Sequence, residues 1–412
     1  MRVAYVTQWF PPEPAPLALW IAKALRDAGC DVHVVTGVPN YPTGVVHPGY
    51  DPNRPSRDTV EGFRVSRMPL YPDHGTAAVG RALNYLSFAA SSALHARAVL
   101  RTADVALVYG SPVTAAVAPY LNRIPYVLLA QDLWPDSVFA TGYLTGGAAS
   151  GVLQRAAGAA SQALYRHAAH VAAITPGMRQ ALIERGLPAG QVSVVYNWVD
   201  EDVVRTSPAD PSLRSDLGLS DDDFVLLYAG TMGPAQDLAT LVDAMAYLAD
   251  RPDVHLVLLG AGTEVPALRD RAAAYGLDRV HVLPSVAIDR IPGLVAAADL
   301  NVVSLADDEL FRMTLPSKVQ TLLACGAPVL GILTGDAAAV VADSGAGLVA
   351  RPGDAADVAA RIREAATMGR EALLARGASG RTYYDRMLSK HKNAAALTGL
   401  LRAAARPEGH RP

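Results

Sequence analysis

The chain has 412 residues, of which 51% are hydrophobic and 18% are charged, and its formal net charge is −3. This length exceeds what one hydrophobic core usually supports, so we expect two domains, and the composition excludes a disordered chain. The slight negative charge, without any basic block, argues against nucleic acid as the main partner. The only cysteines, Cys30 and Cys325, exclude a disulfide framework and a cysteine-based zinc site and are typical of a reducing cytoplasm.

The amino-terminal residues 1–7 predict a buried strand that stops at Pro11 and Pro12, without the longer apolar run of a signal peptide. Nowhere do ~18 apolar residues run uninterrupted, so we expect no membrane-spanning helix. The sequence therefore predicts a cytoplasmic protein, with peripheral contact at the inner face of the cell membrane as the one form of membrane association left open.

Short β-rich runs alternate with helical stretches in two series. The first series comprises residues 2–7, 31–36, 63–68, 104–109, 125–130, 170–175 and 192–196, and the second comprises residues 223–229, 254–259, 279–283, 299–304, 328–333 and 347–350. Strands of a parallel sheet that is covered on both faces are rich in Val, Leu and Ile throughout. The pattern therefore predicts an α/β protein with two doubly wound, Rossmann-like domains.

The predicted domain boundaries follow from the polar, helix-poor linker at residues 197–211. Residues 1–197 form the expected amino-terminal domain and residues 198–384 the carboxyl-terminal one. Residues 385–412 predict a helix that crosses back to the first domain. Because ligands of open α/β sheets bind beyond the carboxyl ends of the strands, two such domains predict a cleft that both of them line.

One predicted helix, from Gly80 to Leu100, has a broad apolar stripe and arginines near its ends. The stripe consists of Leu83, Leu86, Ala90, Ala93, Leu94 and Leu100, and the arginines are Arg81, Arg97 and Arg101. Core packing and docking at a membrane interface both explain such a stripe.

The glycine-rich stretch at residues 230–233 directly follows the apolar run of residues 224–229. A turn of this kind lets backbone N–H groups approach an anion, and a helix N-terminus behind it adds about half a positive charge. Residues 314–318 predict a second helix N-terminus that could bind an anion. Pro316 suits the first helical position, and Lys318 lies within the first turn. The two stretches together predict a pocket for the diphosphate of a sugar nucleotide.

A dinucleotide dehydrogenase is the obvious alternative for a doubly wound sheet. Its first turn needs the G-x-G-x-x-G fingerprint, whereas residues 8–14 contain no glycine. Residues 260–262 supply only two of the three glycines, so the sequence argues against NAD binding.

A series of short motifs extends over nearly the whole chain in a fixed order. They are residues 9–13 (Trp-Phe-Pro-Pro-Glu), 39–44 (Pro-Asn-Tyr-Pro-Thr-Gly), 48–50, 131–137 (Gln-Asp-Leu-Trp-Pro-Asp-Ser), 197–200, 228–236, 259–262, 298–299, 311–318 and 324–329. In order and spacing the chain resembles the family 4 glycosyltransferases, and within them the bacterial branch of colanic-acid and O-antigen amino-deoxysugar transferases.

This resemblance implies a GT-B fold and retaining transfer of a sugar from a nucleoside diphosphate sugar to an acceptor hydroxyl, without a metal ion or other cofactor. The branch implies an acceptor glycan or a polyprenyl-linked glycan on the way to a polysaccharide. A soluble secondary-metabolite aglycone is the alternative acceptor for the same chemistry.

Two residues are the expected catalytic groups. Lys318 would stabilise the negative charge that develops on the leaving phosphate, where metal-dependent transferases use Mg²⁺ or Mn²⁺. Asp132 follows the strand that ends at Ala130, and it would orient or deprotonate the acceptor hydroxyl or support the developing oxocarbenium-like sugar. A solvated lysine and a turn or capping aspartate are the structural alternatives.

Further residues complete the expected site. The donor would contact Gly230, Thr231, Gly233, Gln236, Pro284, Val286, Arg312, Ser317 and Thr321, with the base read by the loop at residues 283–286. The acceptor side would be lined by Glu13, Asn40, Tyr41, Thr43 and Gln131. Turn chemistry alone also explains residues 40–44. Trp134 and Trp198 are expected to be packing residues rather than sugar platforms.

Two departures from the family pattern bear on activity. The positions that match the family's E-x7-E carboxylates are Met313 and Thr321, so ribose recognition falls to Thr321 or to a residue elsewhere. The Arg and Lys that commonly grip phosphate after the first carboxyl-domain strand are also absent, and we expect Arg312 or Lys318 to compensate. An inactive nucleotide-sugar-binding paralogue, a GT-B-type epimerase or hydrolase, and a non-catalytic binding protein therefore stay open as alternatives.

Overall fold

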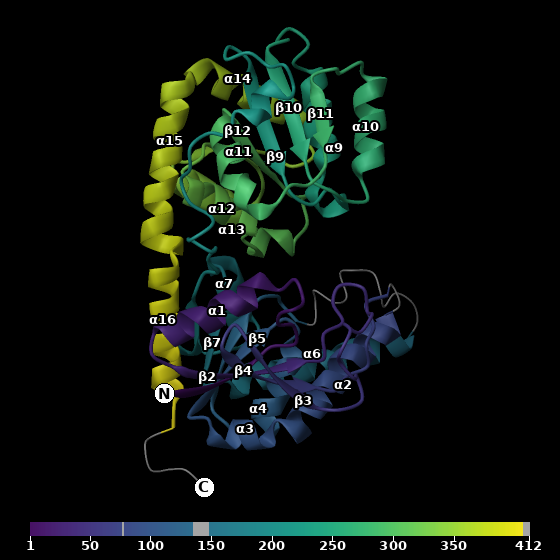
Figure 1. The fold of residues 1–412 in the computed structure, drawn as a ribbon, viewed down its shortest axis with the longest axis vertical. Coiled ribbons are helices and arrows are strands. Elements are labelled where there is room, and N and C mark those ends of the chain that lie inside the picture. Colours follow the sequence, from purple (N-terminus) through teal and green to yellow (C-terminus); the bar gives the residue numbers. More distant parts are fainter. Residues whose placement is uncertain (76–77, 135–147, 407–412) are drawn as a thin grey trace. The chain divides into compact units, whose positions relative to one another are not determined.

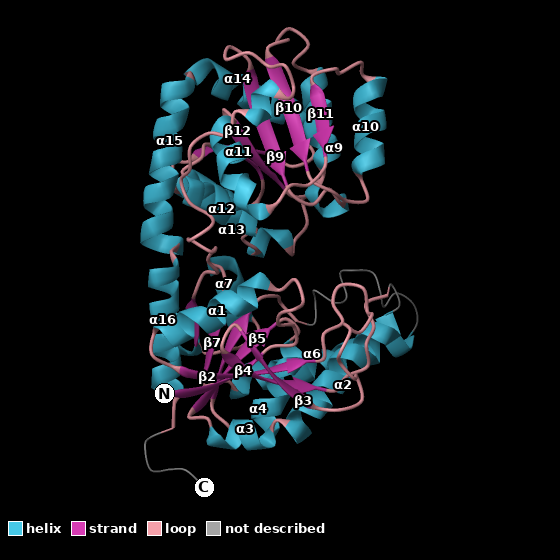
Figure 2. Ribbon diagram, viewed as in Figure 1, coloured by secondary structure: helices cyan, strands magenta, loops and turns pink. Residues whose placement is uncertain are grey.

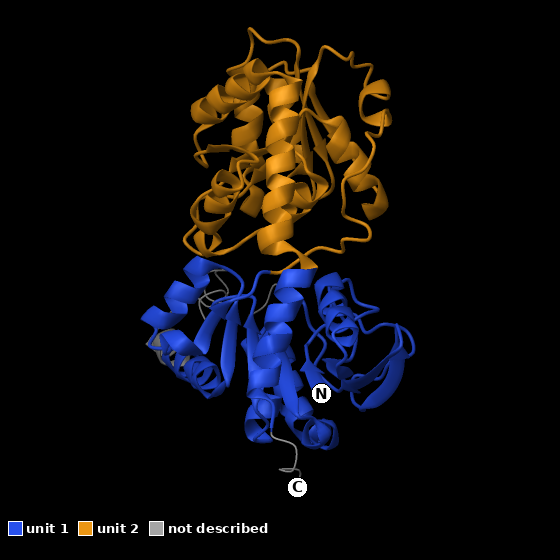
Figure 3. Cartoon of the chain, turned by 90° about the vertical axis from the view of Figure 1, so that its left-hand side faces the viewer, with its two compact units in different colours: residues 1–196, 391–412 blue, residues 197–390 orange. Residues whose placement is uncertain are grey.

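The computed structural model describes residues 1–75, 78–134 and 148–406 (Figure 1). Two compact units make up the chain: residues 1–196 with residues 391–412, and residues 197–390 (Figure 3). Residues 135–137 of the motif at residues 131–137, and the last residues of the chain, 407–412, lie outside the described part.

The first unit contains an eight-stranded sheet in the order β3-β4-β2-β1-β5-β6-β7-β8. Its strands are β1 (Arg2–Val6), β2 (Asp31–Gly37), β3 (Ser56–Val60), β4 (Phe63–Met68), β5 (Val105–Gly110), β6 (Tyr126–Ala130), β7 (His170–Ala173) and β8 (Val192–Val194). All neighbouring strands are parallel except the β3–β4 pair. All seven predicted runs are confirmed as strands. The edge strand β3 was missed because it is polar and largely exposed, so no apolar run marks it.

Helices cover both faces of this sheet (Figure 2). They are α1 (Pro16–Asp27), α2 (Ala78–His95), α3 (Arg97–Thr102), η1 (Val113–Ala116), α4 (Val117–Leu121), α6 (Ala148–His167), α7 (Pro176–Glu184) and the short turn η2 (Ala189–Gln191). The single helix predicted from Gly80 to Leu100 is therefore two helices, α2 and α3, which meet at Ala96.

The second unit contains a six-stranded, wholly parallel sheet in the order β11-β10-β9-β12-β13-β14. Its strands are β9 (Phe224–Ala229), β10 (Val254–Leu259), β11 (Val280–Leu283), β12 (Leu300–Ser304), β13 (Val329–Ile332) and β14 (Gly347–Ala350). All six predicted runs are confirmed as strands. This order is that of a dinucleotide-binding fold, so the prediction of two doubly wound α/β domains is confirmed.

Helices also cover both faces of the second sheet (Figure 2). They are α8 (Ser212–Ser215), η3 (Pro234–Gln236), α9 (Leu238–Ala246), α10 (Val265–Ala274), η4 (Ile288–Arg290), α11 (Ile291–Ala297), η5 (Phe311–Met313), α12 (Ser317–Cys325), α13 (Gly335–Asp343), α14 (Ala355–Met368) and α15 (Arg370–Tyr383). A π-helical turn, Tyr384–Leu388, separates α15 from the last helix, α16 (Lys390–Ala404).

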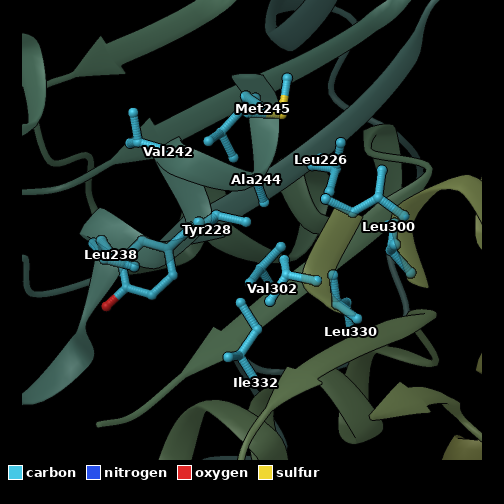
Figure 4. Close-up of a cluster of buried hydrophobic side chains, with 14 of the residues drawn as sticks. Leu226, Tyr228, Leu238, Val242, Ala244, Met245, Leu300, Val302, Leu330 and Ile332 are labelled. Carbon is cyan, nitrogen blue, oxygen red and sulfur yellow. The ribbon is translucent and has the colours of Figure 1, made fainter. Parts of the chain in front are cut away.

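The core of the second unit lies between the central strands and α9 (Figure 4). Leu226 and Tyr228 of β9, Leu300 of β12 and Leu330 of β13 are fully buried there, and Leu241 of α9 belongs to the same cluster. Burying apolar surface stabilises a fold by about 25 cal/mol per Å², so this shared core holds β9 and β12 firmly in place. The loops that leave these two strands consequently start from fixed positions.

The carboxyl-terminal segment returns to the first unit after Lys390 rather than after residue 384. Glu201 links both ends of residues 384–390 to the second unit. Its Oε1 accepts hydrogen bonds from Tyr384 Oη at 3.0 Å and from the Lys390 backbone N–H at 2.7 Å. In the first unit, Asn393 Oδ1 accepts from the Tyr196 N–H at 2.9 Å.

Within residues 1–75, 78–134 and 148–406, no helix combines the length and the apolar character needed to cross a membrane.

Candidate functional site

The second unit places the predicted donor residues around the point where its strand order reverses. Strand β9 has β10 on one side and β12 on the other, and the chain leaves both β9 and β12 at the same edge. Ligands of open α/β sheets bind at this position. The loop at residues 230–236 follows β9, Arg312 lies in η5 after β12, and Ser317, Lys318 and Thr321 lie in α12. Pro284 and Val286 follow β11 at the same edge, two strands away from β9.

The ammonium group of Lys318 lies inside this edge. Its Nζ is 3.3 Å from the centroid of the Tyr228 ring, on the strand that precedes the glycine loop. A Cβ atom at Gly230 would lie 2.8 Å from the same Nζ, so the ammonium group touches the first residue of that loop. In the described residues no carboxylate forms an ion pair with it, and burial lowers the pKa of Lys318 to about 7. A half-buried cation for which the described residues supply no counter-charge suits a site that an anionic ligand completes.

Helix α12 begins next to this ammonium group. Pro316 precedes the helix with extended backbone angles and is its N-cap, where the sequence predicted the first helical position. The Val319 N–H donates to Pro316 O at 2.9 Å, whereas the N–H groups of Ser317 and Lys318 have no acceptor in the described part of the chain. A helix N-terminus with free amides attracts an anion. The first turn of α12 thus has two amides without a protein acceptor among the described residues, and it also carries the side chain of Lys318.

The amides of the glycine loop are largely engaged within the protein, which corrects the prediction that they cradle phosphate. The Gly230 N–H donates to Leu259 O at 2.8 Å, the Met232 N–H to Ala261 O at 2.8 Å, and the Gly233 N–H to Gln236 Oε1 at 3.1 Å. The first two bonds continue the β9–β10 ladder beyond the strands, and the third closes a turn within the loop. Of the four loop amides, only that of Thr231 has no acceptor in the described residues.

Helix α9 likewise does not start directly behind the glycine loop. The short turn η3 and Asp237, which has a left-handed backbone conformation, stand between the loop and Leu238. The sequence predicted that the N-terminus of α9 would lie at the diphosphate. In the structure η3 and Asp237 separate that N-terminus from the glycine loop. Of the two predicted helix ends, that of α12 begins beside the Lys318 side chain.

The glycines at positions 260 and 262 have a packing role. A Cβ at Gly260 would overlap the carbonyl of Gly230, and a Cβ at Gly262 would overlap that of Met232. Only glycine lets the two loops run this close together. The incomplete fingerprint at residues 260–262 is thus explained by contact between loops.

Arg312 is less available than the sequence suggested. Its Nη2 lies 2.9 Å from Asp307 Oδ1 and 3.1 Å from Oδ2, in a bidentate pair near the surface. Thr321 lies one turn beyond Lys318 in α12 and is half-buried, and Ser317 is exposed. Of the two residues expected to compensate for the missing phosphate-binding charges, Arg312 is paired with Asp307, whereas Lys318 has no ion-pair partner among the described residues.

The first unit has a pocket of about 270 Å³ at its own point of strand reversal, between β1 and β5. Its lining includes Trp9, Tyr41, Tyr109 and Ser111. The sequence predicted Tyr41 and missed the other three. The signal that could have found these three residues is their position at the carboxyl ends of predicted strands. Trp9 follows β1, Ser111 follows β5, and Tyr109 lies near the end of β5.

Asp132 is connected to this pocket through Ser111. Ser111 Oγ donates a hydrogen bond of 2.7 Å to Asp132 Oδ2, which joins the residues that follow β5 and β6. Burial raises the pKa of the Asp132 carboxyl group, and the bond from Ser111 acts in the opposite direction. Gln131 beside it is buried. Of the residues predicted for the acceptor side, Tyr41 lines the pocket, and Glu13 is joined to it by the hydrogen bond from the Tyr41 N–H.

Glu13, Asn40 and Thr43 hold the shape of two loops. Glu13 is 3% exposed, and its carboxylate accepts from the N–H groups of Phe10 at 3.1 Å and of Asn40 and Tyr41 at 2.9 Å. The side-chain amide of Asn40 donates to Val38 O at 2.8 Å. Thr43 Oγ1 accepts from the Val45 N–H at 3.2 Å. These contacts fit the turn interpretation of residues 40–44.

Replacing Glu13 by glutamine should destabilise the first unit by about 1–3 kcal/mol. A glutamine has one carbonyl oxygen for three N–H donors, and its NH2 group would face another donor. Chemical denaturation measures the loss, with the exposed Glu184→Gln in the same unit as the matched control. Unchanged stability together with lost use of acceptor would instead indicate that Glu13 contacts the acceptor.

An aromatic cluster borders the same pocket. The ring centroids of Trp9 and Tyr41 are 5.4 Å apart, and those of Tyr41 and His74 are 5.2 Å apart. Tyr85 of α2 lies 6.4 Å from Trp9 and 5.5 Å from Trp134. Trp134 therefore packs against a neighbouring ring, in line with its expected packing role. Such rings offer flat apolar faces on which a sugar ring can stack.

In the described ranges, no group of three or more His, Cys, Asp or Glu side chains is arranged to hold a metal ion.

Comparison with known protein families matches most of the chain. Residues 14–198 match the family described as a glycosyl transferase 4-like domain, and residues 223–367 match the family described as glycosyl transferases group 1. The Escherichia coli (strain K12) protein WcaI, whose name assigns it to colanic acid biosynthesis as a glycosyl transferase, is 29% identical over 318 residues. That alignment covers 74% of this chain and 75% of WcaI.

Solved structures with the same fold cover almost the entire chain. The crystal structure of Anabaena Alr3699/HepE in complex with UDP has a TM-score of 0.72 at 20% identity, covering 98% of this chain and 100% of that one. Sucrose-phosphate synthase from Thermosynechococcus elongatus has a TM-score of 0.72 at 18% identity, covering 98% of each chain. At these identities the structural likeness shows the fold, which is the GT-B fold that the sequence predicted.

Proposed function

This chain belongs to the family 4 glycosyltransferases with a GT-B fold, and on that premise we propose that it transfers a sugar from a nucleoside diphosphate sugar to an acceptor hydroxyl with retention of configuration. The observation that carries the proposal is the ammonium group of Lys318, which has no carboxylate partner among the described residues and belongs to the helix turn whose first two amides also lack an acceptor there. The UDP in the similar Anabaena structure supports the choice of a nucleotide sugar as donor.

The proposed chemistry needs positive charge at the leaving group. As the bond between the sugar and the diphosphate breaks, negative charge grows on the outer phosphate, and Lys318 with the amides of Ser317 and Lys318 stabilises it. The leaving phosphate oxygen takes the proton of the acceptor hydroxyl while that hydroxyl attacks from the same face, so no protein nucleophile is required. In this proposal Lys318 and α12 provide the stabilisation that a divalent cation provides in metal-dependent transferases.

Asp132 has the acceptor-side role in this proposal. The raised pKa of its buried carboxyl group and its bond to Ser111 suit a group that orients the acceptor hydroxyl through a hydrogen bond. We further propose that the acceptor is a glycan or polyprenyl-linked glycan for a surface polysaccharide, which the likeness to WcaI supports. A soluble aglycone is the competing acceptor.

One experiment tests the reaction class. The purified protein is incubated with a panel of nucleotide sugars, and release of nucleoside diphosphate is followed with and without candidate acceptors. Release that requires an acceptor supports transfer, whereas release or isomerisation without one would indicate a hydrolase or epimerase. Thermal stabilisation by nucleotide sugars without any turnover would indicate an inactive binding paralogue.

We also propose that the protein docks on an anionic membrane surface through helix α2. Core packing does not explain its apolar stripe, because Val79, Leu83, Leu86 and Leu94 are between 46% and 69% exposed. Only Leu100 of the predicted stripe, in α3, is fully buried. An exposed helix face of this kind suits insertion into a bilayer interface.

The charge of the surrounding segment favours a membrane over a second copy of the chain as the partner of α2. Residues 78–131 contain four arginines and one acidic residue, Asp104, although the whole chain has a net charge of −3. Asp104 accepts a hydrogen bond from the Arg2 backbone N–H at 2.8 Å, and Arg97, Arg101 and Arg123 are exposed. We propose that the excess of arginine in this segment attracts anionic lipid and disfavours pairing with an identical basic segment.

The double variant Leu83→Ser/Leu86→Ser should bind vesicles of mixed neutral and anionic phospholipid about 10–100-fold more weakly than the unaltered protein. Vesicle co-sedimentation measures the loss, and Leu374→Ser serves as the control because Leu374 is equally exposed in the other unit. Absence of vesicle binding by the unaltered protein would contradict the docking proposal. Self-association that the double variant abolishes would assign the face to a second copy instead.

A further inference from the structure

Tyr228 is fixed at both ends of its side chain. It is the next-to-last residue of β9, is fully buried, and packs in the core of the second unit with Met232 and Leu238. Its hydroxyl group donates a hydrogen bond of 2.5 Å to Thr231 O in the glycine loop. Figure 4 shows the ring beside Leu238, with its hydroxyl directed away from the labelled core residues. Burial raises the pKa of Tyr228, so the phenol stays neutral at every physiological pH.

The free face of this ring is covered by the ammonium group of Lys318. The distance of 3.3 Å from Nζ to the ring centroid is well inside the range of cation–π interactions. Gly230 closes the space from another side, because a Cβ there would lie 2.8 Å from Nζ and 3.9 Å from Tyr228 Oη. The ammonium group is therefore confined between an aromatic face and a residue without a side chain.

We propose that the ring face of Tyr228 is the seat of the Lys318 ammonium group, and that Tyr228 is the positioning residue that keeps this charge at the diphosphate site. The role of the seat in transfer rests on the function proposed above, whereas the seat itself does not. A neutral ring attracts the cation without neutralising it, so the charge stays available to the donor. A carboxylate in the same place would compete with the phosphate for the ammonium group.

Other charged groups do not account for the position of the ammonium group. Burial is the one cause that lowers the pKa of Lys318, and no charged neighbour contributes among the described residues. Arg312 is held by Asp307, with their closest atoms 2.9 Å apart. Tyr228 is consequently the one titratable side chain shown in contact with Lys318, and it stays protonated.

Fluorinated rings test the seat without changing its shape. Phenylalanine and its 4-fluoro, 3,5-difluoro and 3,4,5-trifluoro derivatives are placed at position 228, because each fluorine weakens the attraction between ring and cation while the side chain keeps its volume. The chain has four lysines, Lys23, Lys318, Lys390 and Lys392, so ¹³C labelling at lysine Cε gives four signals. Lys318→Arg identifies the signal of Lys318.

The pKa of Lys318 measured from this signal should fall with each fluorine, by about one unit across the series, a tenfold loss of proton affinity. The signals of the other three lysines should not respond. A Lys318 pKa that is the same in all four proteins overturns the seat. Tyr228→Phe alone separates the loss of the hydroxyl bond to Thr231 from the loss of the ring face.

Transfer activity gives the second readout. If the seat positions the catalytic charge, the alkaline limb of kcat/KM should move to lower pH in step with the pKa measured for Lys318. Tyr228→Leu should lower kcat further than Tyr228→Phe, because only the phenylalanine keeps the ring. If the Lys318 pKa follows the fluorines but the alkaline limb does not move, the seat stands and the role of Lys318 in the proposed function fails.

Discussion

Replacing Lys318 by alanine lowers kcat for sugar transfer by about 100- to 1,000-fold, the loss expected when one preorganised group that stabilises charge in the transition state is removed. The ammonium group has no carboxylate partner in the described residues, so its removal breaks no ion pair. The two units should therefore stay folded. Single-turnover kinetics with a nucleotide sugar and an acceptor measures kcat, and circular dichroism checks the fold.

Lys23→Ala is the matched control for this substitution. Lys23 lies in α1, where its Nζ is 3.3 Å from Glu61 Oε2 at the surface of the first unit. The loss of an exposed pair of this kind changes stability by about 1 kcal/mol at most. Lys23→Ala should thus transfer sugar at the unaltered rate. A Lys318→Ala protein with full kcat would remove Lys318 from the mechanism, although the family assignment would stand.

Binding of a nucleoside diphosphate should weaken about tenfold per pH unit above pH 7. In the free protein the pKa of Lys318 is lowered to about 7 by burial, and a bound diphosphate raises it again because the opposite charge favours the ammonium form. Above pH 7 the ligand therefore binds together with a proton. Below pH 7 the lysine is already charged, and this contribution to affinity is constant.

Titration calorimetry at pH 8 in two buffers of different ionisation enthalpy measures that proton uptake. Lys318→Arg gives the control, because a guanidinium group stays charged throughout this range. The arginine variant should bind without taking up a proton, with an affinity that does not change between pH 7 and pH 9. Proton uptake that persists in the arginine variant would assign the titrating group to another residue.

Apolar runs were enough to predict the sheets. Strands such as β9 and β10 are buried on both faces, so their sequences are apolar at almost every position. The sequence did not predict strand β3, because this strand lies at the sheet edge and carries the polar residues Arg57, Asp58 and Thr59. A polar edge strand has no apolar run in its own sequence that would predict it. Strand β3 can be recognised only from its pairing with β4.

The site was only partly predictable for a related reason. Sequence could place Lys318 in the first turn of α12 from the proline that precedes it, but not over the ring of Tyr228, which lies 90 positions earlier. In the sequence Glu13 resembled a ligand-binding carboxylate. The three backbone N–H groups that donate hydrogen bonds to it can be recognised only in the fold. The sequence likewise does not reveal that the Gly230 and Met232 N–H groups extend the β9–β10 hydrogen-bond ladder.

The return of the chain after Lys390 has a consequence for biosynthesis. The first unit is built from residues 1–196 and residues 391–412, and Leu397 and Leu401 of α16 are fully buried in it. A ribosome therefore completes the whole second unit before it delivers the helix that closes the first. Until then the nascent amino-terminal half leaves exposed the apolar surface that Leu397 and Leu401 later cover.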